Sequence, residues 1–214
     1  MRQIDKKLTR DKVVAEMRRA ILYGTFPANQ ELSQDKVAAD LGVSKMPVRE
    51  AIQVLAMEGL LTILPNRSPI VNELSEEYIR DHFEIRSMLE QEAVARAAQR
   101  DINADELRQT FEKEKQAIAT EDFEAFNYFN GKIHQLIWNL SGNLKLEQIL
   151  SQMWHTMHID NFAKKNALRS NEEHRMIIEA IIKKDAAAAR KAMERHVIHS
   201  YEKIIALKRS QMPS

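Results

Sequence analysis

The distribution of proline constrains the fold of this chain more than any other feature of its sequence. Four of the five prolines are Pro27, Pro47, Pro65 and Pro69, and the fifth is Pro213. Proline interrupts helices because it lacks a backbone N–H and clashes with the preceding turn. The long interval before Pro213 is therefore predicted to be almost entirely helical, whereas the earlier part of the chain consists of shorter elements.

Charge and histidine content change at the same point of the chain. Residues 1–72 contain 11 Lys or Arg and 8 Asp or Glu, whereas residues 73–214 contain 21 and 23. All seven histidines follow residue 72. We therefore predict two domains, a small basic one over 1–72 and a longer, slightly acidic, helical one over 73–214.

Composition excludes several classes of protein. The chain has no cysteine, so a disulfide scaffold and a cysteine nucleophile are excluded, and any metal must bind through nitrogen and oxygen ligands. The formal net charge of +1 gives no global signature of nucleic-acid or membrane binding. No run of about 18 apolar residues occurs, and the charged start has no apolar segment. We therefore expect a cytoplasmic protein that does not enter a membrane.

The first domain has the pattern of a helix, a helix-turn-helix and a β-hairpin. Apolar residues at helical spacing mark a first helix that stops at Tyr23-Gly24. Ser33 begins a second helix, Gly42 follows its end, and Ser44 begins a third. Short apolar runs on both sides of residues 65–69 predict two strands around a tight basic tip. This order of elements is that of a winged helix-turn-helix.

Capping residues predict the helix starts of the second domain. Ser75 is followed by two glutamates, and Asn103 and Ser170 each have a glutamate three residues later, which is the capping-box pattern. The remaining boundaries are predicted near Asp122, Ser141–Asn143 and Asp185. About six helices result, enough for a bundle. The fold class is therefore mainly α: three helices with a β-hairpin wing, followed by an all-helical bundle.

The third helix of the first domain carries the candidate DNA contacts. In a helix-turn-helix, the first turn of this helix enters the major groove. Lys45 and Arg49 suit guanine edges and phosphates, Met46 offers an apolar contact to a thymine methyl, and Ser44 suits a phosphate. Arg67, at the tip of the hairpin, is placed to reach the minor groove or the backbone. One such cation alone would be an ordinary solvated charge, but the set in this topology predicts binding to double-stranded DNA.

Three segments of this domain match a known pattern. They are residues 20–24 (Ala-Ile-Leu-Tyr-Gly), 41–52 (Leu-Gly-Val-Ser-Lys-Met-Pro-Val-Arg-Glu-Ala-Ile) and 58–60 (Glu-Gly-Leu). Together they resemble the winged helix-turn-helix of GntR-superfamily transcriptional regulators. The chain departs from the usual pattern in having Pro27-Ala28-Asn29 for Pro-Gly, Met46 for a common Thr, and Ser68 for the wing glycine. The resemblance implies a homodimeric regulator that binds a palindromic operator.

Four polar residues of the second domain form a candidate metal site. Asn130 and His134 are four residues apart and share a helix face, while His174 and His196 lie on the two final predicted helices. Three imidazoles and one oxygen donor suit Zn²⁺ or Ni²⁺ and leave coordination positions open. Spacing alone is weak evidence, because histidines on helices are usually surface or core residues. That ordinary role is the one expected of the other four, His82, His155, His158 and His199.

A second resemblance supports this site. The segments 129–134 (Phe-Asn-Gly-Lys-Ile-His), 141–143 (Ser-Gly-Asn), 173–174 (Glu-His) and 193–196 (Met-Glu-Arg-His) are similar to the ligand-binding domain of the FadR/FCD branch. The resemblance implies a divalent metal, Zn or Ni, on Asn130, His134, His174 and His196, beneath a pocket for a small organic acid. Asn130 stands where Asp is usual, which implies weaker metal binding or an empty site.

Two more residues take candidate roles in this pocket. Arg86 matches a position of the family's first effector-domain helix where an arginine often faces the cavity, and it suits a bidentate contact to a carboxylate. An ion pair with Glu90, one turn on, is the alternative role. Gly131 costs roughly 1 kcal/mol relative to alanine within a helix, and it serves either to make room for a ligand or to permit close helix packing.

The sequence therefore favours a metal-containing, dimeric repressor whose DNA binding responds to a small carboxylate or sugar-acid-like effector. A DNA-binding dimer whose helical bundle is only structural is one alternative. A metal-dependent hydrolase is a second, but no carboxylate is tied by spacing to the histidines as a general base. We therefore expect that the protein is not an enzyme.

Overall fold

The computed structural model describes residues 6–65, 67–157 and 164–210 of the 214-residue chain. The described part divides into two compact units. The first comprises residues up to Tyr78 together with those from Leu207 onward, and the second comprises Ile79–Ala206.

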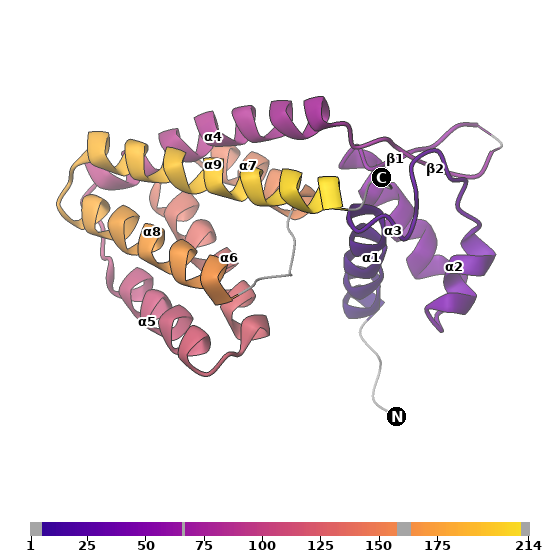
Figure 1. Cartoon of the computed structure of the whole chain (residues 1–214), viewed down its shortest axis with the longest axis horizontal. Helices are drawn as coiled ribbons and strands as arrows, with labels where there is room; N and C mark the ends of the chain where they lie inside the picture. The colour runs from indigo at the N-terminus through magenta and orange to yellow at the C-terminus, as the bar shows by residue number, and fades with distance from the viewer. Residues whose placement is uncertain (1–5, 66, 158–163, 211–214) are drawn as a thin grey trace. The chain divides into compact units, whose positions relative to one another are not determined.

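The first unit is a winged helix-turn-helix, as predicted. Its elements are α1 (Lys6–Leu22), α2 (Gln34–Asp40), α3 (Lys45–Met57), β1 (Leu61–Thr62) and β2 (Ile70–Val71) (Figure 1). The two strands are antiparallel, with Leu61 opposite Val71, and an isolated bridge joins Glu31 to Ile70. The apolar faces of α1, α2 and α3 close over one core, whose largest fully buried side chains include Met17, Leu55 and Leu60.

Capping chemistry sets the turn between α2 and α3. The Ser33 side chain accepts a hydrogen bond from the Lys36 backbone N–H and so begins α2. Gly42 has a φ of +64°, which a residue with a Cβ rarely adopts, and this conformation ends α2 and redirects the chain. Ser44 occupies the N-cap position of α3, but its hydroxyl makes no capping hydrogen bond, contrary to the expected cap. The Ser44 hydroxyl is exposed instead.

Six helices build the second part of the described chain, the number expected from the sequence. They are α4 (Glu76–Gln99), α5 (Asp105–Ala119), α6 (Phe123–Leu140), α7 (Leu144–Thr156), α8 (Lys164–Ile182) and α9 (Ala186–Ser210). Within the second unit, α4 and α9 run side by side, joined by the Arg190–Glu92 ion pair and by the rings of Phe83 and Tyr201 (Figure 1). Helix α5 packs on α6 and α8, and α6 packs on α7.

Four of the predicted helix starts are confirmed by side-chain caps. These are Ser75, Asp122, Asn143 and Asp185, each of which accepts a hydrogen bond from the backbone N–H three residues later. Two predicted capping boxes are wrong. In the first of them, the N-cap of helix α5 is Ala104 and not Asn103. The Asn103 side chain accepts from the backbone N–H of Asp105, two residues later, whereas a capping box uses the N–H three residues later.

The second wrong capping box is the more informative one. Ser170 does not begin a helix, because it lies buried inside α8, which already starts at Lys164. Its hydroxyl faces the Asn130 amide oxygen, and the Glu173 carboxylate faces two histidines instead of a backbone N–H. Residues that look like a cap are therefore interior polar groups of the bundle. Among the described helices, none is long and apolar enough to cross a membrane.

Candidate functional site

Three buried histidines converge inside the helical bundle. His134 comes from α6, His174 from α8 and His196 from α9, and their exposed fractions are 0%, 0% and 3%. One ring nitrogen of each lies within 4.8 Å of the others. Helix packing therefore brings together three of the four residues of the predicted metal site in an arrangement that can hold a metal ion.

Each of these rings is oriented by its own carboxylate. The Nδ1 atom of His134 lies 3.3 Å from Glu90 Oε2, that of His174 lies 2.9 Å from Glu114 Oε1, and that of His196 lies 2.9 Å from Glu173 Oε2. An ionised carboxylate only accepts hydrogen bonds, so each Nδ1 carries the proton and each Nε2 keeps its lone pair. Carboxylates in this position are usual behind histidines that bind metals.

The inward-facing nitrogens form an arrangement that suits a cation. His134 Nε2 lies 3.0 Å from His196 Nε2, and the buried Nε2 of His174 has no hydrogen-bond partner among the described residues. Burial lowers the pKa of His134 to about 4 and that of His196 to about 3, against the opposing effect of their carboxylates. The His134 and His196 rings are therefore neutral near pH 7, and their Nε2 lone pairs face each other at close range. A divalent cation would relieve that repulsion.

Glu90 is the centre of a buried network at one side of the histidines. Besides His134, it accepts from the Trp138 indole N–H at 2.7 Å and from Arg86, whose Nη2 lies 3.3 Å away. Burial favours the neutral carboxyl, but His134, Arg86 and Trp138 outweigh it and hold the pKa of Glu90 at about 2. The Arg86–Glu90 ion pair expected as an alternative is thus formed, and Arg86 also stacks on Trp154, 4.6 Å from its ring centre.

Glu173 connects the histidines to a more exposed set of side chains. Its Oε2 accepts from His196, while its Oε1 accepts from His199 and from Arg169 Nε, which lies 3.3 Å away. Burial opposes ionisation, but His196 and His199 together lower the pKa of Glu173. One carboxylate therefore links a candidate metal ligand to two residues outside the histidine cluster.

Asn130 lies one turn before His134 on α6 and is buried. Its amide oxygen is 3.5 Å from the Ser170 hydroxyl, a long hydrogen bond that holds the oxygen only weakly.

A Cβ added at the neighbouring Gly131 would lie 3.6 Å from Trp154 Nε1, which is ordinary contact. Gly131 therefore packs closely against α7.

A cavity of about 70 Å³ adjoins the histidine cluster. Its wall includes Asn130 and His196 together with Arg86, Arg169 and Lys203. The cavity brings the predicted effector residue, Arg86, and two of the four predicted metal ligands to the same space.

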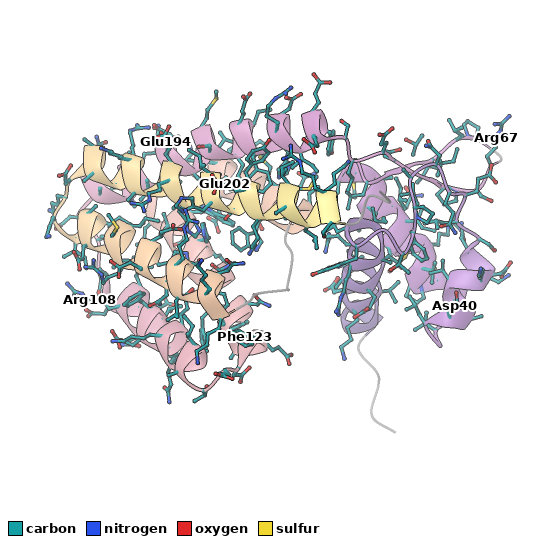
Figure 2. The ribbon with its side chains drawn as sticks, viewed as in Figure 1. Asp40, Arg67, Arg108, Phe123, Glu194 and Glu202 are labelled. Carbon is teal, nitrogen blue, oxygen red and sulfur yellow. The ribbon has the colours of Figure 1, made fainter. Side chains whose placement is uncertain are left out.

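The five predicted DNA-contacting residues lie at the surface of the first unit. Ser44, Lys45, Met46 and Arg49 are exposed on the first turns of α3 or just before it. Lys45 forms an ion pair with Asp35, in which both side chains are about 70% exposed. Arg67 is exposed between β1 and β2, at the outer edge of the hairpin (Figure 2). Among the described residues, no buried partner restrains Lys45, Arg49 or Arg67, so these cations can meet a nucleic-acid surface.

The orienting carboxylates behind the histidines are not evident from the sequence. Glu114 looks like one solvated charge among several in the sequence Glu-Lys-Glu-Lys, and nothing local marks it. Its only signal is a helical period of three or four that places it with Leu107, Thr110 and Ile118 on the buried face of α5. His199, expected to have an ordinary role, contacts Glu173. His82 is largely buried and lies outside the cluster, whereas the His155 side chain and His158 lie outside the described residues.

Comparison with known proteins places both parts of the chain in families. The family model of bacterial regulatory proteins of the gntR family matches residues 9–71, and that of the FCD domain matches residues 81–199. The HTH-type transcriptional regulator YdhC of Bacillus subtilis is 29% identical over 198 residues, which cover 87% of each chain. The gluconate operon transcriptional repressor of the same organism is 28% identical and is covered over 80% of its length, with 86% of this chain.

Two solved structures share the fold. Escherichia coli McbR/YncC has a TM-score of 0.71 at 23% identity, with 94% of this chain and 98% of that chain covered. The metal-free FCD domain of TM0439 has a TM-score of 0.54 at 21% identity and covers 65% of this chain and 99% of its own.

Proposed function

This chain belongs to the GntR family of bacterial transcription regulators and carries an FCD domain, and from that premise we propose that it is a metal-containing repressor controlled by a small organic acid. The gluconate operon repressor and the other curated relatives are regulators of transcription, not enzymes. In our proposal the chain acts as a homodimer, and each first unit binds one half of a palindromic operator.

The proposed DNA contacts follow from the position of α3. Arg49 and Lys45 donate to base edges or phosphates in the major groove, and Met46 contacts a base methyl. Ser44, whose hydroxyl caps nothing within the chain, donates to a phosphate. Arg67 contacts the backbone or the minor groove. The exposed Lys45–Asp35 pair is a weak constraint, because solvent-exposed ion pairs contribute at most about 1 kcal/mol.

The 3.0 Å separation of His134 Nε2 and His196 Nε2 is the observation that carries the metal part of the proposal. His134, His174 and His196 would hold the ion through Nε2, and Asn130 would offer its amide oxygen. Nitrogen ligands with one oxygen suit Zn²⁺ or Ni²⁺. When bound, such an ion supplies open coordination positions for a carboxylate. Glu90, Glu114 and Glu173 hold the rings in the required orientation.

The cavity beside the histidines is the proposed effector site. Arg86 faces it while Glu90 holds its guanidinium in place, so an acid in the cavity meets a prearranged donor. Binding there would favour one arrangement of α4 and α9, the helices that carry Arg86 and His196. The DNA affinity of the dimer would change as a result.

Metal analysis tests the first step of the proposal. Untagged protein is analysed by mass spectrometry as purified, beside His134→Ala and a control, His82→Gln, which lies outside the cluster. We expect about one Zn or Ni per chain in the wild type and the control, and none in His134→Ala. Equal metal content and an equal melting temperature in all three would support the alternative, a purely structural bundle.

DNA binding is tested separately with the full chain. An operator is selected from a pool of random duplexes and then used in gel-shift titrations with added carboxylates. Selection of a palindrome and its release by one class of acid are the expected results. An operator that no carboxylate releases would reject effector control and leave the DNA-binding claim intact.

A further inference from the structure

The wall of the cavity is positively charged. Among the described residues that line it, three carry full positive charges, Arg86, Arg169 and Lys203, and none is Asp or Glu. A cavity of about 70 Å³ is small compared with roughly 300 Å³ for ordinary ligand sites, so a bound acid has few carbon atoms. This wall selects for a compact and strongly anionic ligand.

The positive charges lie at two ends of the cavity. The inner end contains His196 and Asn130, each 3% exposed, and is the proposed place of the metal. At the outer end, the Arg169 side chain is 51% exposed. On α9, His196 and Lys203 are seven residues apart on one face, a rise of about 10 Å. A single carboxylate held at the inner end would not reach the cations at the outer end.

Glu173 leaves the outer donors available to a ligand. Its Oε2 holds His196, while its single Oε1 is shared by Arg169 and His199. Arg169 contacts Glu173 through Nε, its side chain is 51% exposed, and its guanidinium has further N–H donors. An anionic group beside Arg169 would therefore find donors that are already placed.

We propose that the effector carries two separate anionic groups, of which the second is held by Arg169 and Lys203 at the outer end of the cavity. The inference rests on the proposed effector site and adds the class of ligand that fits it: a short dicarboxylate or a phosphorylated acid. Arg86 and the metal end take the first anionic group, and His199 is an additional donor for the second.

Calorimetric titration of the full-length, metal-loaded protein tests this inference. The probes are acetate, succinate, glutarate and 3-phosphoglycerate. The variants are Arg169→Gln and Lys203→Met, and the matched controls are Arg195→Gln and Lys191→Met, exposed residues of α9 that do not line the cavity. Metal content is measured for every protein, so that a damaged histidine site is detected.

We expect the wild type and the controls to bind at least one two-headed acid about tenfold more tightly than acetate, the effect of one charge-assisted hydrogen bond. In Arg169→Gln and Lys203→Met this preference should fall below about threefold, with acetate binding and metal content unchanged. Comparing the affinity for 3-phosphoglycerate with the affinities for succinate and glutarate shows whether the outer end prefers a phosphate or a carboxylate.

Two results would overturn the inference. One is equal affinity for acetate and every two-headed acid in the wild type, and the other is equal weakening of all probes by the variants. The measured metal content distinguishes a failure of the second anion site from a failure of the proposed metal site. Metal bound without a preference for two-headed acids rejects only the second anion site, whereas a preference in a protein that takes up no metal rejects only the metal.

Discussion

His134 Nε2 lies 3.0 Å from His196 Nε2, although 62 residues separate the two histidines in the sequence. Each ring turns its Nδ1 toward a buried carboxylate, Glu90 for His134 and Glu173 for His196. The two lone pairs that result face each other in a site from which water is largely excluded. The contact between the two Nε2 atoms cannot be predicted from the spacing of the histidines or from their helix faces, and the metal proposal depends on it.

The carboxylate behind His174 should control metal affinity without binding the metal. In Glu114→Gln, the amide still fits the space but no longer carries the charge that fixes and strengthens the imidazole. Loss of such a partner costs about 10- to 100-fold in metal affinity. Competition with a chelating dye would measure the change. Glu112→Gln, an exposed position on the same helix, is the control, and equal affinities in the two variants would contradict the assigned role.

Asn130→Asp should affect the metal-free and the metal-bound protein in opposite directions. A carboxylate is a stronger cation ligand than an amide, so Zn²⁺ affinity should rise at least about tenfold. Without metal, the new charge is buried with the Ser170 hydroxyl as its hydrogen-bond partner, and the melting temperature should fall. Thermal melts with and without Zn²⁺ measure both effects. Asn139→Asp, exposed on the same helix, should change neither, and a melting temperature unaffected by Zn²⁺ in Asn130→Asp would exclude the amide as a ligand position.

His82 should make the protein less stable in weak acid. Burial lowers its pKa from 6.5 to about 4, with Arg86 acting in the same direction. Between pH 6.5 and 4 the unfolded chain therefore binds more protons than the folded protein. As the pH is lowered through this range, protonation of His82 decreases the free energy of unfolding by at most about 3 kcal/mol. Above pH 6.5 the contribution is complete.

Urea unfolding of wild type and His82→Gln in the presence of a chelator measures this contribution. His134 and His196 also have lowered pKa values and titrate in both proteins, so the difference between the two curves isolates His82. The wild type should lose stability relative to His82→Gln as the pH falls from 6.5 to 4. Parallel curves across this window would show that His82 keeps its ordinary pKa.

Arg49 and Arg67 should contribute to DNA binding in different ways. Arg49→Ala removes a donor that reaches base edges, so operator affinity should fall by about 1–3 kcal/mol and discrimination against mutated operators should weaken. Arg67→Ala removes a backbone contact, so operator and random duplex should lose affinity equally, and the salt dependence should decrease by about one ion. Fluorescence anisotropy at several salt concentrations measures both.

Lys183→Ala, an exposed cation in the second unit, is the control for overall charge. It should match the wild type with both duplexes. If Arg49→Ala behaves like this control, α3 does not read the operator in the way proposed.

Local patterns were sufficient for most of the fold. The winged helix-turn-helix follows from Ser33, Gly42 and the hairpin residues, because caps, left-handed turns and strand alternation are decided by neighbours in sequence. At Ser170, however, the local sequence pattern predicted a helix start that the structure does not have. Serine followed by glutamate three residues later has the form of a cap, but in the interior both side chains find partners on other helices.

The sequence by itself determined which helices form, where most of them begin, and which histidines and cations are candidates for metal and DNA. Tertiary structure alone decided that Glu90, Glu114 and Glu173 stand behind the three histidines, from 44, 60 and 23 residues away. It also decided that Glu173 joins His196 to the outer cavity. The reason is physical: helix formation depends on contacts within a turn or two, whereas a buried charge is tolerated only where packing supplies a partner, and that partner can come from any helix.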